Sequence, residues 1–308
     1  MIFKNKKGSK GARGSKIVAR EERSCPLFAF LIPILVFMIA FIAEGVWPFG
    51  DRAVTIIDSF HQYVPFFSEL HDKVMHGESL LYSWHGGLGF NFLAVMAYYI
   101  ASTLNVLLVY FPAFEVLILL KVGLAGLFMY IYLQKRLGKH DAALILFADA
   151  YALSGFFIAY NWNNMWLDSV ALFPLIILAA EQLIDDGRWI PYSTLLGLAI
   201  FCNYYIAIMI CIFLVLYFFA YWLMKERESF GSFIKRGLVF AGASLLAGAM
   251  AAVYLIPTAF AMMNTSKGSS PTKISFYRSY LDVLKHHMSF VDPTQITGAP
   301  NVYCSILV

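Results

Sequence analysis

Long apolar runs, almost free of charged residues, constrain the fold of this chain more than any other feature of its sequence. A helix needs roughly 20 apolar residues to cross the hydrocarbon core of a bilayer. Hydrophobic residues make up 60% of the chain and charged residues only 14%, whereas a soluble domain is about half apolar and a quarter charged. These proportions predict an all-α fold, a polytopic transmembrane helical bundle. The runs lie at about 26–47, 91–111, 115–133, 142–160, 169–184, 190–224 and 237–260.

The first 24 residues are strongly basic, with eight Lys or Arg side chains and two glutamates. A basic tail could bind nucleic acid, but this one directly precedes an apolar run, and such clusters are typical of the cytoplasmic side of a membrane. We therefore predict a disordered cytoplasmic tail at 1–24, a cell-membrane location and no nucleic-acid partner. The run at 26–47 is too long for the core of a signal peptide, so it should be a retained anchor.

Charge also indicates the side of the membrane on which each loop lies. The segments 134–140 and 225–236 are basic and should be cytoplasmic, whereas 48–90 is more acidic and should be outside. An odd number of spans must then separate 48–90 from 134–140, although two apolar runs lie between them. The run at 91–111 is the more polar of the two and ends before Pro112, so we expect an interfacial or re-entrant helix packed on the outer face there.

These assignments predict a long first outer loop at 48–114 that contains interfacial helices. The run 190–224 is too long for one span, and we place an outer turn at Asn203-Tyr204-Tyr205 within it. A polar outer segment is expected at 261–300. The transmembrane domain, 25–308, then has predicted spans at about 26–47, 115–133, 142–160, 169–184, 190–203, 206–224 and 237–257, and an incomplete eighth span from about 302.

Two carboxylates, Asp58 and Asp168, are predicted to lie at the same outer face, one in the first outer loop and one just before the fourth span. In a helical turn, Asp58, His61 and Gln62 would share one face, because residues three and four apart are neighbours. Two such carboxylates could supply a general base and a supporting acid, or could share a divalent metal. A solvated loop aspartate without a function is the commoner case, so the surrounding pattern has to decide.

Other polar and aromatic residues allow two interpretations each. Trp162 and Trp166 suit either an aromatic belt at the membrane interface or a platform that stacks on a sugar. Lys267 and its basic neighbours could hold a phosphate or could simply be solvated. The loop histidines match no common metal site and the four cysteines form no Cys-x-x-Cys pair, so we name no metal ligands.

Lys121 and Asp149 are charged residues that fall inside apolar runs. Charges within a membrane are rare and are functional candidates by default. Lys121 is near the outer end of its predicted span, so we expect its amine to reach the interface. Asp149 lies deeper in its run and needs a polar partner.

A series of motifs follows the first predicted span. It comprises Asp58-x-x-His61-Gln62-Tyr63-x-Pro65-Phe66-Phe67, Gly77-Glu78-Ser79-x-x-Tyr82-Ser83-Trp84, Gly87-x-Gly89-x-Asn91-Phe92, Tyr98-Tyr99-x-x-Ser102-x-x-Asn105 and Pro300-Asn301-Val302-Tyr303-Cys304. Together they resemble the bacterial YfhO family of membrane proteins. The likeness extends from about residue 26 to the end of the chain.

The resemblance implies a fold and an activity similar to those of the GT-C class of membrane glycosyltransferases. Such enzymes take a sugar from a polyprenyl-phosphate carrier and keep an essential acid in the first outer loop, often with another in the second. Asp58 and Asp168 occupy these two places. The acid pair of many first loops is here Asp58 followed by Ser59, which favours a lone base over a metal site.

We therefore predict a GT-C-like membrane glycosyltransferase with Asp58 and Asp168 as its catalytic residues. The resemblance implies a polyprenyl-phosphate-linked sugar as donor and a cell-envelope polymer or lipid, such as lipoteichoic acid, as acceptor. A divalent metal cofactor is left open, and a transporter or flippase of a lipid-linked substrate, or a non-catalytic scaffold, are the alternatives. Substrate contacts are predicted for His61, Gln62, Tyr63, Trp84, Asn163, Trp166 and Lys267.

Overall fold

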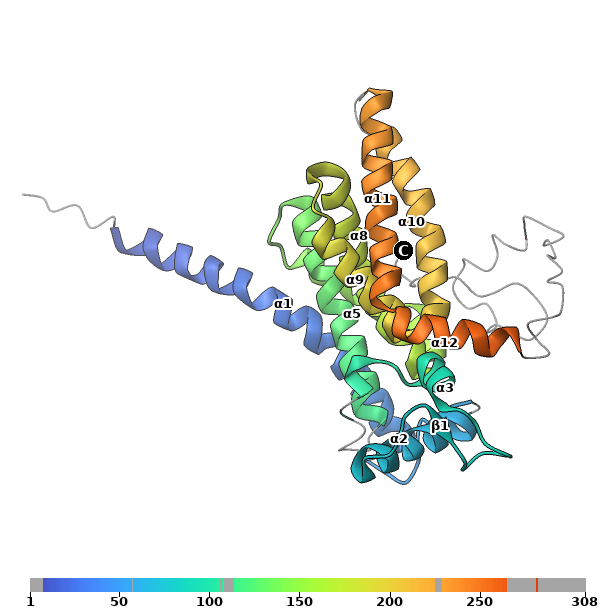
Figure 1. Ribbon diagram of the computed structural model, residues 1–308. Helices are drawn as coiled ribbons and strands as arrows, with labels where there is room; N and C mark the ends of the chain where they lie inside the picture. Colours follow the sequence, from blue (N-terminus) through green and yellow to red (C-terminus); the bar gives the residue numbers. More distant parts are fainter. Residues whose placement is uncertain are drawn as a thin grey trace, which may run out of the picture.

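The computed structural model describes residues 8–56, 58–105, 107, 114–224, 229–264 and 281, with side chains from Cys25 onwards. Lys267, most of the expected outer segment and the expected eighth span lie outside these residues. The described elements are helices, apart from one short two-stranded hairpin (Figure 1). The all-α fold class predicted from the sequence is therefore confirmed.

Six segments of the described residues are long and apolar enough to cross a membrane, whereas the sequence predicted seven spans. One of the six, Ala143–Tyr160, consists of two consecutive helices, and two further apolar helices are shorter. The main helices are α1 (Gly8–Glu44, with its candidate span at Cys25–Glu44), α5 (Phe114–Leu137), α6 (Ala143–Ala152), α7 (Gly155–Tyr160), α8 (Asn164–Asp186), α9 (Trp189–Cys202), α10 (Tyr204–Met224), α11 (Phe230–Met250) and α12 (Ala252–Met263).

Asn203 explains why α9 is short. Its backbone is extended, with φ −161° and ψ 105°, and this ends α9 at Cys202. Its side-chain oxygen accepts a hydrogen bond from the amide of Ile206 at 2.9 Å, which satisfies a free amide in the first turn of α10. The 14 residues of α9 extend over about 21 Å, which is less than the roughly 30 Å of the hydrocarbon core.

The long loop after α1 folds into small elements. The run at 91–111, which we predicted not to span, forms an eight-residue helix and one 3-10 turn within its described part. Asn91 caps that helix, because its side-chain oxygen accepts a hydrogen bond from the amide of Ala94 at 3.0 Å. The elements are η1 (Ser59–Tyr63, π-helical), α2 (Val64–His76), β1 (Tyr82–Ser83), β2 (Phe90–Asn91), α3 (Phe92–Tyr99) and η2 (Thr103–Asn105), and β1 pairs antiparallel with β2.

Three boundaries differ from the predictions. Helix α1 begins at Gly8, so it includes most of the segment 1–24 that we expected to be disordered. The predicted span 142–160 is interrupted at Ser154, whose extended backbone (ψ 159°) separates α6 from α7. Helix α8 begins at Asn164 rather than near 169, because the polar residues that looked like a loop form contacts inside the bundle.

Helices α5 and α8 lie side by side in the middle of the molecule, and α1 packs along α5 (Figure 1). Helix α9 packs on both α8 and α11. The hydrophobic cluster that joins α8 to α11 contains fully buried side chains from successive helices, among them Ile176, Leu196 and Leu214. This arrangement holds the N-terminal end of α8 against Lys121 in the N-terminal half of α5 and against Ser102, which follows α3.

Helices α1 and α5 approach closely because two glycines of α5 face α1. A Cβ atom added at Gly126 would clash with the backbone carbonyl of Ala29 and would lie 3.1 Å from Cγ of Pro33. One added at Gly123 would lie 2.6 Å from Cδ1 of Ile34. Small residues allow membrane helices to pack at short distance, so these glycines set the position of α1.

We expect Gly126→Ala to destabilise the protein by about 1–3 kcal/mol, since the backbone of α1 would have to move to accommodate the methyl group. Thermal unfolding in detergent measures the effect. Gly248→Ala in α11 is the matched control, because nothing lies within 4 Å of its added Cβ and alanine favours a helix by up to about 1 kcal/mol over glycine. Equal midpoints for both variants would contradict close packing at Gly126.

Candidate functional site

Side-chain contacts distinguish the two ends of the bundle. At one end, Arg136 at the C-terminus of α5 lies 3.6 Å from Glu181 near the C-terminus of α8. At the opposite end, the backbone amide of Val54 donates a hydrogen bond to Glu115 in the first turn of α5. We call this second end, formed with residues 46–105, the loop end. The structure places Asp58 and Asp168 there together, while the membrane side on which the loop end lies stays a prediction.

Lys121 of α5 and Asp168 of α8 form a buried ion pair at the loop end. The Nζ atom of Lys121 lies 2.6 Å from Oδ2 of Asp168 and donates a second hydrogen bond to the backbone carbonyl of Asn164 at 3.0 Å. The hydroxyl of Ser102 donates to Oδ1 of Asp168 at 2.8 Å. Lys121 is 0% exposed and Asp168 is 5% exposed. Both charges are therefore paired, as buried charges have to be.

This pair corrects two expectations. Lys121 does not extend to the interface, because a carboxylate on the neighbouring helix neutralises it inside the bundle. Asp168 does not lie in a loop, because α8 starts one turn earlier and includes it. Its catalytic role stays a prediction, but Lys121 and Ser102 already occupy its two carboxylate oxygens. A small cavity of about 160 Å³ adjoins the pair.

Replacing Lys121 with methionine should leave the carboxylate of Asp168 buried without a counter-charge. Removing one partner of such a pair costs about 3–5 kcal/mol, which thermal unfolding in detergent would report. The double variant Lys121→Met/Asp168→Leu removes both charges and should recover most of the lost stability. A single variant as stable as the unchanged protein would show that the pair is unimportant for folding.

Asp58 has a different environment from Asp168. It is partly exposed and stands directly before the π-helical turn η1, a kind of turn that often occurs at functional sites. Among the described residues, its carboxylate forms neither an ion pair nor a hydrogen bond. Burial raises the pKa of the phenols of Tyr63 and Tyr99, and the nearby carboxylate of Asp58 raises it further. Burial also raises the pKa of the Tyr98 phenol, and Asp58 is one of the further causes there. Asp58 is therefore a carboxylate surrounded by protonated phenols.

Tyr63 connects the surroundings of Asp58 to α8. Its phenol donates a hydrogen bond to the side-chain oxygen of Asn163, and the next residue, Asn164, binds Lys121 through its carbonyl. Tyr63 is 1% exposed and Asn163 is 2% exposed, so this contact is shielded from solvent. Two of the predicted substrate-binding residues thus contact each other and fix the position of η1 against the bundle.

Aromatic rings from four elements form a row at the loop end. Tyr205 of α10 stacks on Trp166 of α8, with ring centroids 6.3 Å apart and planes at 26°. Tyr160 lies 5.6 Å from Trp166, and Tyr98 lies 6.3 Å from Tyr205 and 4.7 Å from Tyr99. We call these five residues the aromatic strip. Tyr205 is 42% exposed, so part of the strip is accessible.

The other predicted site residues are more scattered. His61 is exposed, and Trp84 is 76% exposed on the hairpin. The side-chain oxygen of Gln62 is buried without a hydrogen-bond partner in the described part of the chain. Asp149 is buried in α6, and its Oδ1 likewise has no partner there. Lys267 lies outside the described residues.

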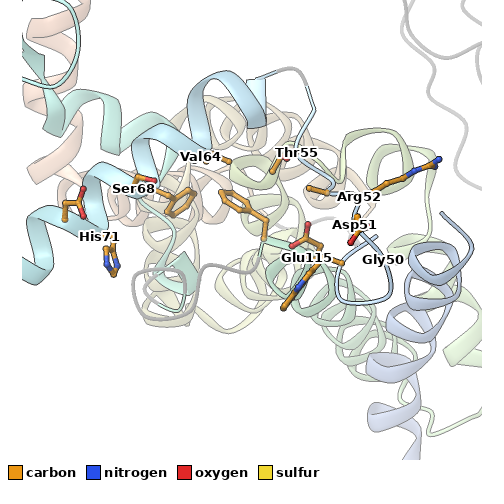
Figure 2. Close-up of a pocket in the computed structure, with 13 residues that line it drawn as sticks. Gly50, Asp51, Arg52, Thr55, Val64, Ser68, His71 and Glu115 are labelled. Atoms are coloured by element: carbon orange, nitrogen blue, oxygen red, sulfur yellow. The ribbon is translucent and has the colours of Figure 1, made fainter. Parts of the chain in front are cut away.

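A cavity of about 780 Å³ lies beside α2, lined by the face of that helix that includes Val64, Ser68 and His71 (Figure 2). The carboxylates of Asp51 and Glu115 lie near each other at one end of it, and His71 lies at the other end (Figure 2). Its volume is within the range of small-molecule sites. None of the predicted site residues lines it, so sequence reasoning missed this cavity.

No three side chains of His, Cys, Asp or Glu converge to form a metal-binding group in the ranges that the structure describes. Asp168 is held by Lys121, and the carboxylate of Asp58 forms neither an ion pair nor a hydrogen bond with the described residues. No ligand set can therefore be named for a divalent metal.

Glu69 of α2 holds the hairpin in place, a contact that sequence reasoning did not predict. Its carboxylate lies 3.3 Å from Nζ of Lys73 and 2.5 Å from Nδ1 of His85. Burial alone would raise the pKa of Glu69, but hydrogen bonds from Ser83, His85 and Lys73 outweigh it and hold the pKa below its usual value. The i,i+4 spacing of Glu69 and Lys73 was visible in the sequence, whereas the contact with His85 depends on the hairpin.

Glu69→Gln should lower the thermal midpoint at neutral pH, and the difference from the unchanged protein should disappear in acid. A carboxyl whose pKa is depressed by folding stabilises the fold above its unfolded pKa, about 4.3, and loses this contribution as the pH falls through the folded pKa. Unfolding curves between about pH 7 and pH 3.5 would show this convergence. A difference that stays constant over this range would contradict an ionised Glu69.

A family model described as "Bacterial membrane protein YfhO" matches residues 29–308. The match starts within the candidate span of α1 and includes the whole loop end. No curated protein and no solved structure matches the chain.

Proposed function

The chain belongs to the YfhO family of bacterial membrane proteins, and from this premise we propose that it is a membrane glycosyltransferase. It would transfer a sugar from a polyprenyl-phosphate donor to a cell-envelope acceptor such as lipoteichoic acid. The loop end would face the outside of the cell membrane, with the N-terminus in the cytoplasm. Six candidate spans support the membrane location.

The environment of Asp58 is the observation that carries this proposal. A general base needs a carboxylate that is free to accept a proton and is positioned by its surroundings. Asp58 has neither an ion pair nor a hydrogen bond among the described residues, while the adjacent Tyr63 is fixed by its hydrogen bond to Asn163. Asp168, in contrast, is held by Lys121 and Ser102. The two carboxylates thus suit different roles.

In the proposed reaction, Asp58 accepts the proton of an acceptor hydroxyl as its oxygen attacks the anomeric carbon of the donor sugar. A new carbon–oxygen bond forms, the bond from that carbon to the phosphate oxygen breaks, and polyprenyl phosphate leaves with the bonding electrons. Attack from the side opposite the phosphate inverts the anomeric centre. Asp58 then releases its proton to water.

The ion pair of Asp168 would position this base. Lys121 holds the backbone at Asn164, and the preceding Asn163 accepts the hydrogen bond of Tyr63, five residues after Asp58. Losing the pair would therefore disturb Asp58 through the start of α8 and η1. We propose that Asp168 acts as a positioning residue, with the direct catalytic step carried by Asp58.

The aromatic strip supports a sugar as the substrate. Aromatic rings offer apolar faces to the C–H groups of a pyranose, while phenol and indole groups supply hydrogen bonds at their edges. Tyr205, which stacks on Trp166, is 42% exposed, so this end of the strip is open to a bound sugar. Trp166 and Tyr205 are accordingly the residues that we propose to contact the sugar.

The decisive experiment measures transfer of radiolabelled sugar from a polyprenyl-phosphate donor by membranes that contain the protein. Asp58→Asn should lower the rate by about 10²–10⁴-fold, the usual contribution of a general base. Glu78→Gln is the matched control, because this carboxylate is exposed in the same loop and, among the described residues, contacts only Lys73, at 3.5 Å. Its rate should be unchanged.

Full activity of Asp58→Asn would show that Asp58 is not the base. Movement of the lipid-linked sugar across the bilayer without transfer would favour the transporter or flippase instead. Neither activity would favour a non-catalytic scaffold.

A further inference from the structure

The hairpin formed by β1 and β2 presents large apolar side chains to its surroundings. Leu88 is 96% exposed, Trp84 is 76%, Leu81 is 64% and Tyr82 is 40% exposed. Exposed apolar groups that are clustered in this way mark an interaction site more often than isolated ones do. Of these four side chains, only Trp84 was predicted to contact the substrate, and the transfer step proposed above uses none of them.

Contacts within the hairpin hold its tip in one conformation, so the exposure of its apolar side chains is a property of the fold. Tyr82 packs edge-on against Trp84 with ring centroids 4.9 Å apart, and its hydroxyl covers Gly89, where any side chain would clash. Gly89 has a φ of +95°, a conformation that favours glycine. On the other face, His85 is held by Glu69 of α2. These contacts hold the hairpin with its apolar side chains exposed.

Charge is missing from this part of the sequence. Residues 79–114 contain no Asp, Glu, Lys or Arg. A loop that extends into water or docks on a charged partner would normally carry such residues, whereas the interface of a membrane favours Trp, Tyr and Leu without nearby charge. The composition thus points to lipid as the occupant of the exposed surface.

The hairpin is also continuous with a helix that is suited to a membrane surface. Helix α12 follows span α11 and runs across the bundle axis at the loop end (Figure 1). Its Val253 and Phe260 are each 64% exposed. Leu80, next to the hairpin, and Tyr254 of α12 line one cavity of about 390 Å³. The hairpin and α12 therefore belong to the same apolar margin of the bundle.

We propose that the hairpin tip, Leu81 to Leu88, inserts into the bilayer leaflet at the loop end and anchors the loop end to the lipid surface. The lipid contact involves acyl chains and the glycerol region, so it does not depend on a particular headgroup. It is independent of the proposed glycosyl transfer and could hold even if that function were wrong.

Tryptophan quenching tests this in vesicles of zwitterionic lipid that contain the whole protein. The contribution of Trp84 to the fluorescence is obtained by subtracting the emission of the Trp84→Phe variant from that of the unchanged protein. We expect lipids brominated near the top of their acyl chains to quench most of this difference, and iodide in the aqueous phase to quench little of it. A matched control places tryptophan on the exposed side of α2, as Asp72→Trp combined with Trp84→Phe. Iodide should quench most of the fluorescence of this added tryptophan, and the brominated lipids should quench little of it.

Quenching of Trp84 by iodide to the same extent as the control would overturn the proposal, because the tip would then be in water. Protection from both quenchers would overturn it as well, because the tip would then be covered by protein, such as a second copy. Leu88→Trp combined with Trp84→Phe provides a second probe at a side chain that is almost fully exposed, so its substitution should not disturb folding. Lipid quenching at both positions is the result that the insertion requires.

Discussion

The ion pair between Lys121 and Asp168 is the interaction on which the loop end depends. Moving two charges out of water costs several kcal/mol for each ion, so each must have a partner at close distance. The requirement is met by three segments that are distant in sequence, namely α5, the start of α8 and the Ser102 segment. Helices α5 and α8 could not separate without leaving a charge unpaired inside the bundle, and loss of the Ser102 segment would remove a hydrogen bond from Asp168.

Several features of the surrounding structure follow from this pair. Because the carbonyl of Asn164 binds Lys121, α8 begins one turn before its apolar run, and Asn163 is placed where Tyr63 can donate to it. Tyr63 in turn fixes the π-helical turn that follows Asp58. The position of the partly exposed carboxylate of Asp58 therefore depends on the buried ion pair between Lys121 and Asp168. Two aspartates that look equivalent in the sequence acquire different environments in this way.

Features with a local physical cause could be predicted from the sequence. The apolar runs predicted the helices, and the polar Asn203 predicted the turn that separates α9 from α10. Features that depend on a distant partner could not. We expected Lys121 to reach the interface because the sequence shows its helix alone. The carboxylate that holds Lys121 inside the bundle belongs to α8, and it lies close only because α8 packs against α5. The contact of Glu69 with His85 likewise requires the hairpin to fold back on α2.

By itself, the sequence determined that the chain is a helical membrane protein, since its apolar surface is too large for water and its helices satisfy their own backbone hydrogen bonds in lipid. It also determined that the loop after the first apolar run carries Asp58, and that a stretch without charged residues follows Asp58 in the same loop. Only the tertiary structure decided that Asp168 is neutralised by Lys121, whereas Asp58 has no ion pair within the part of the chain that the structure describes. The reason is that a charge inside a bundle is compensated by whichever helix packs against it, and packing is a property of the assembled fold.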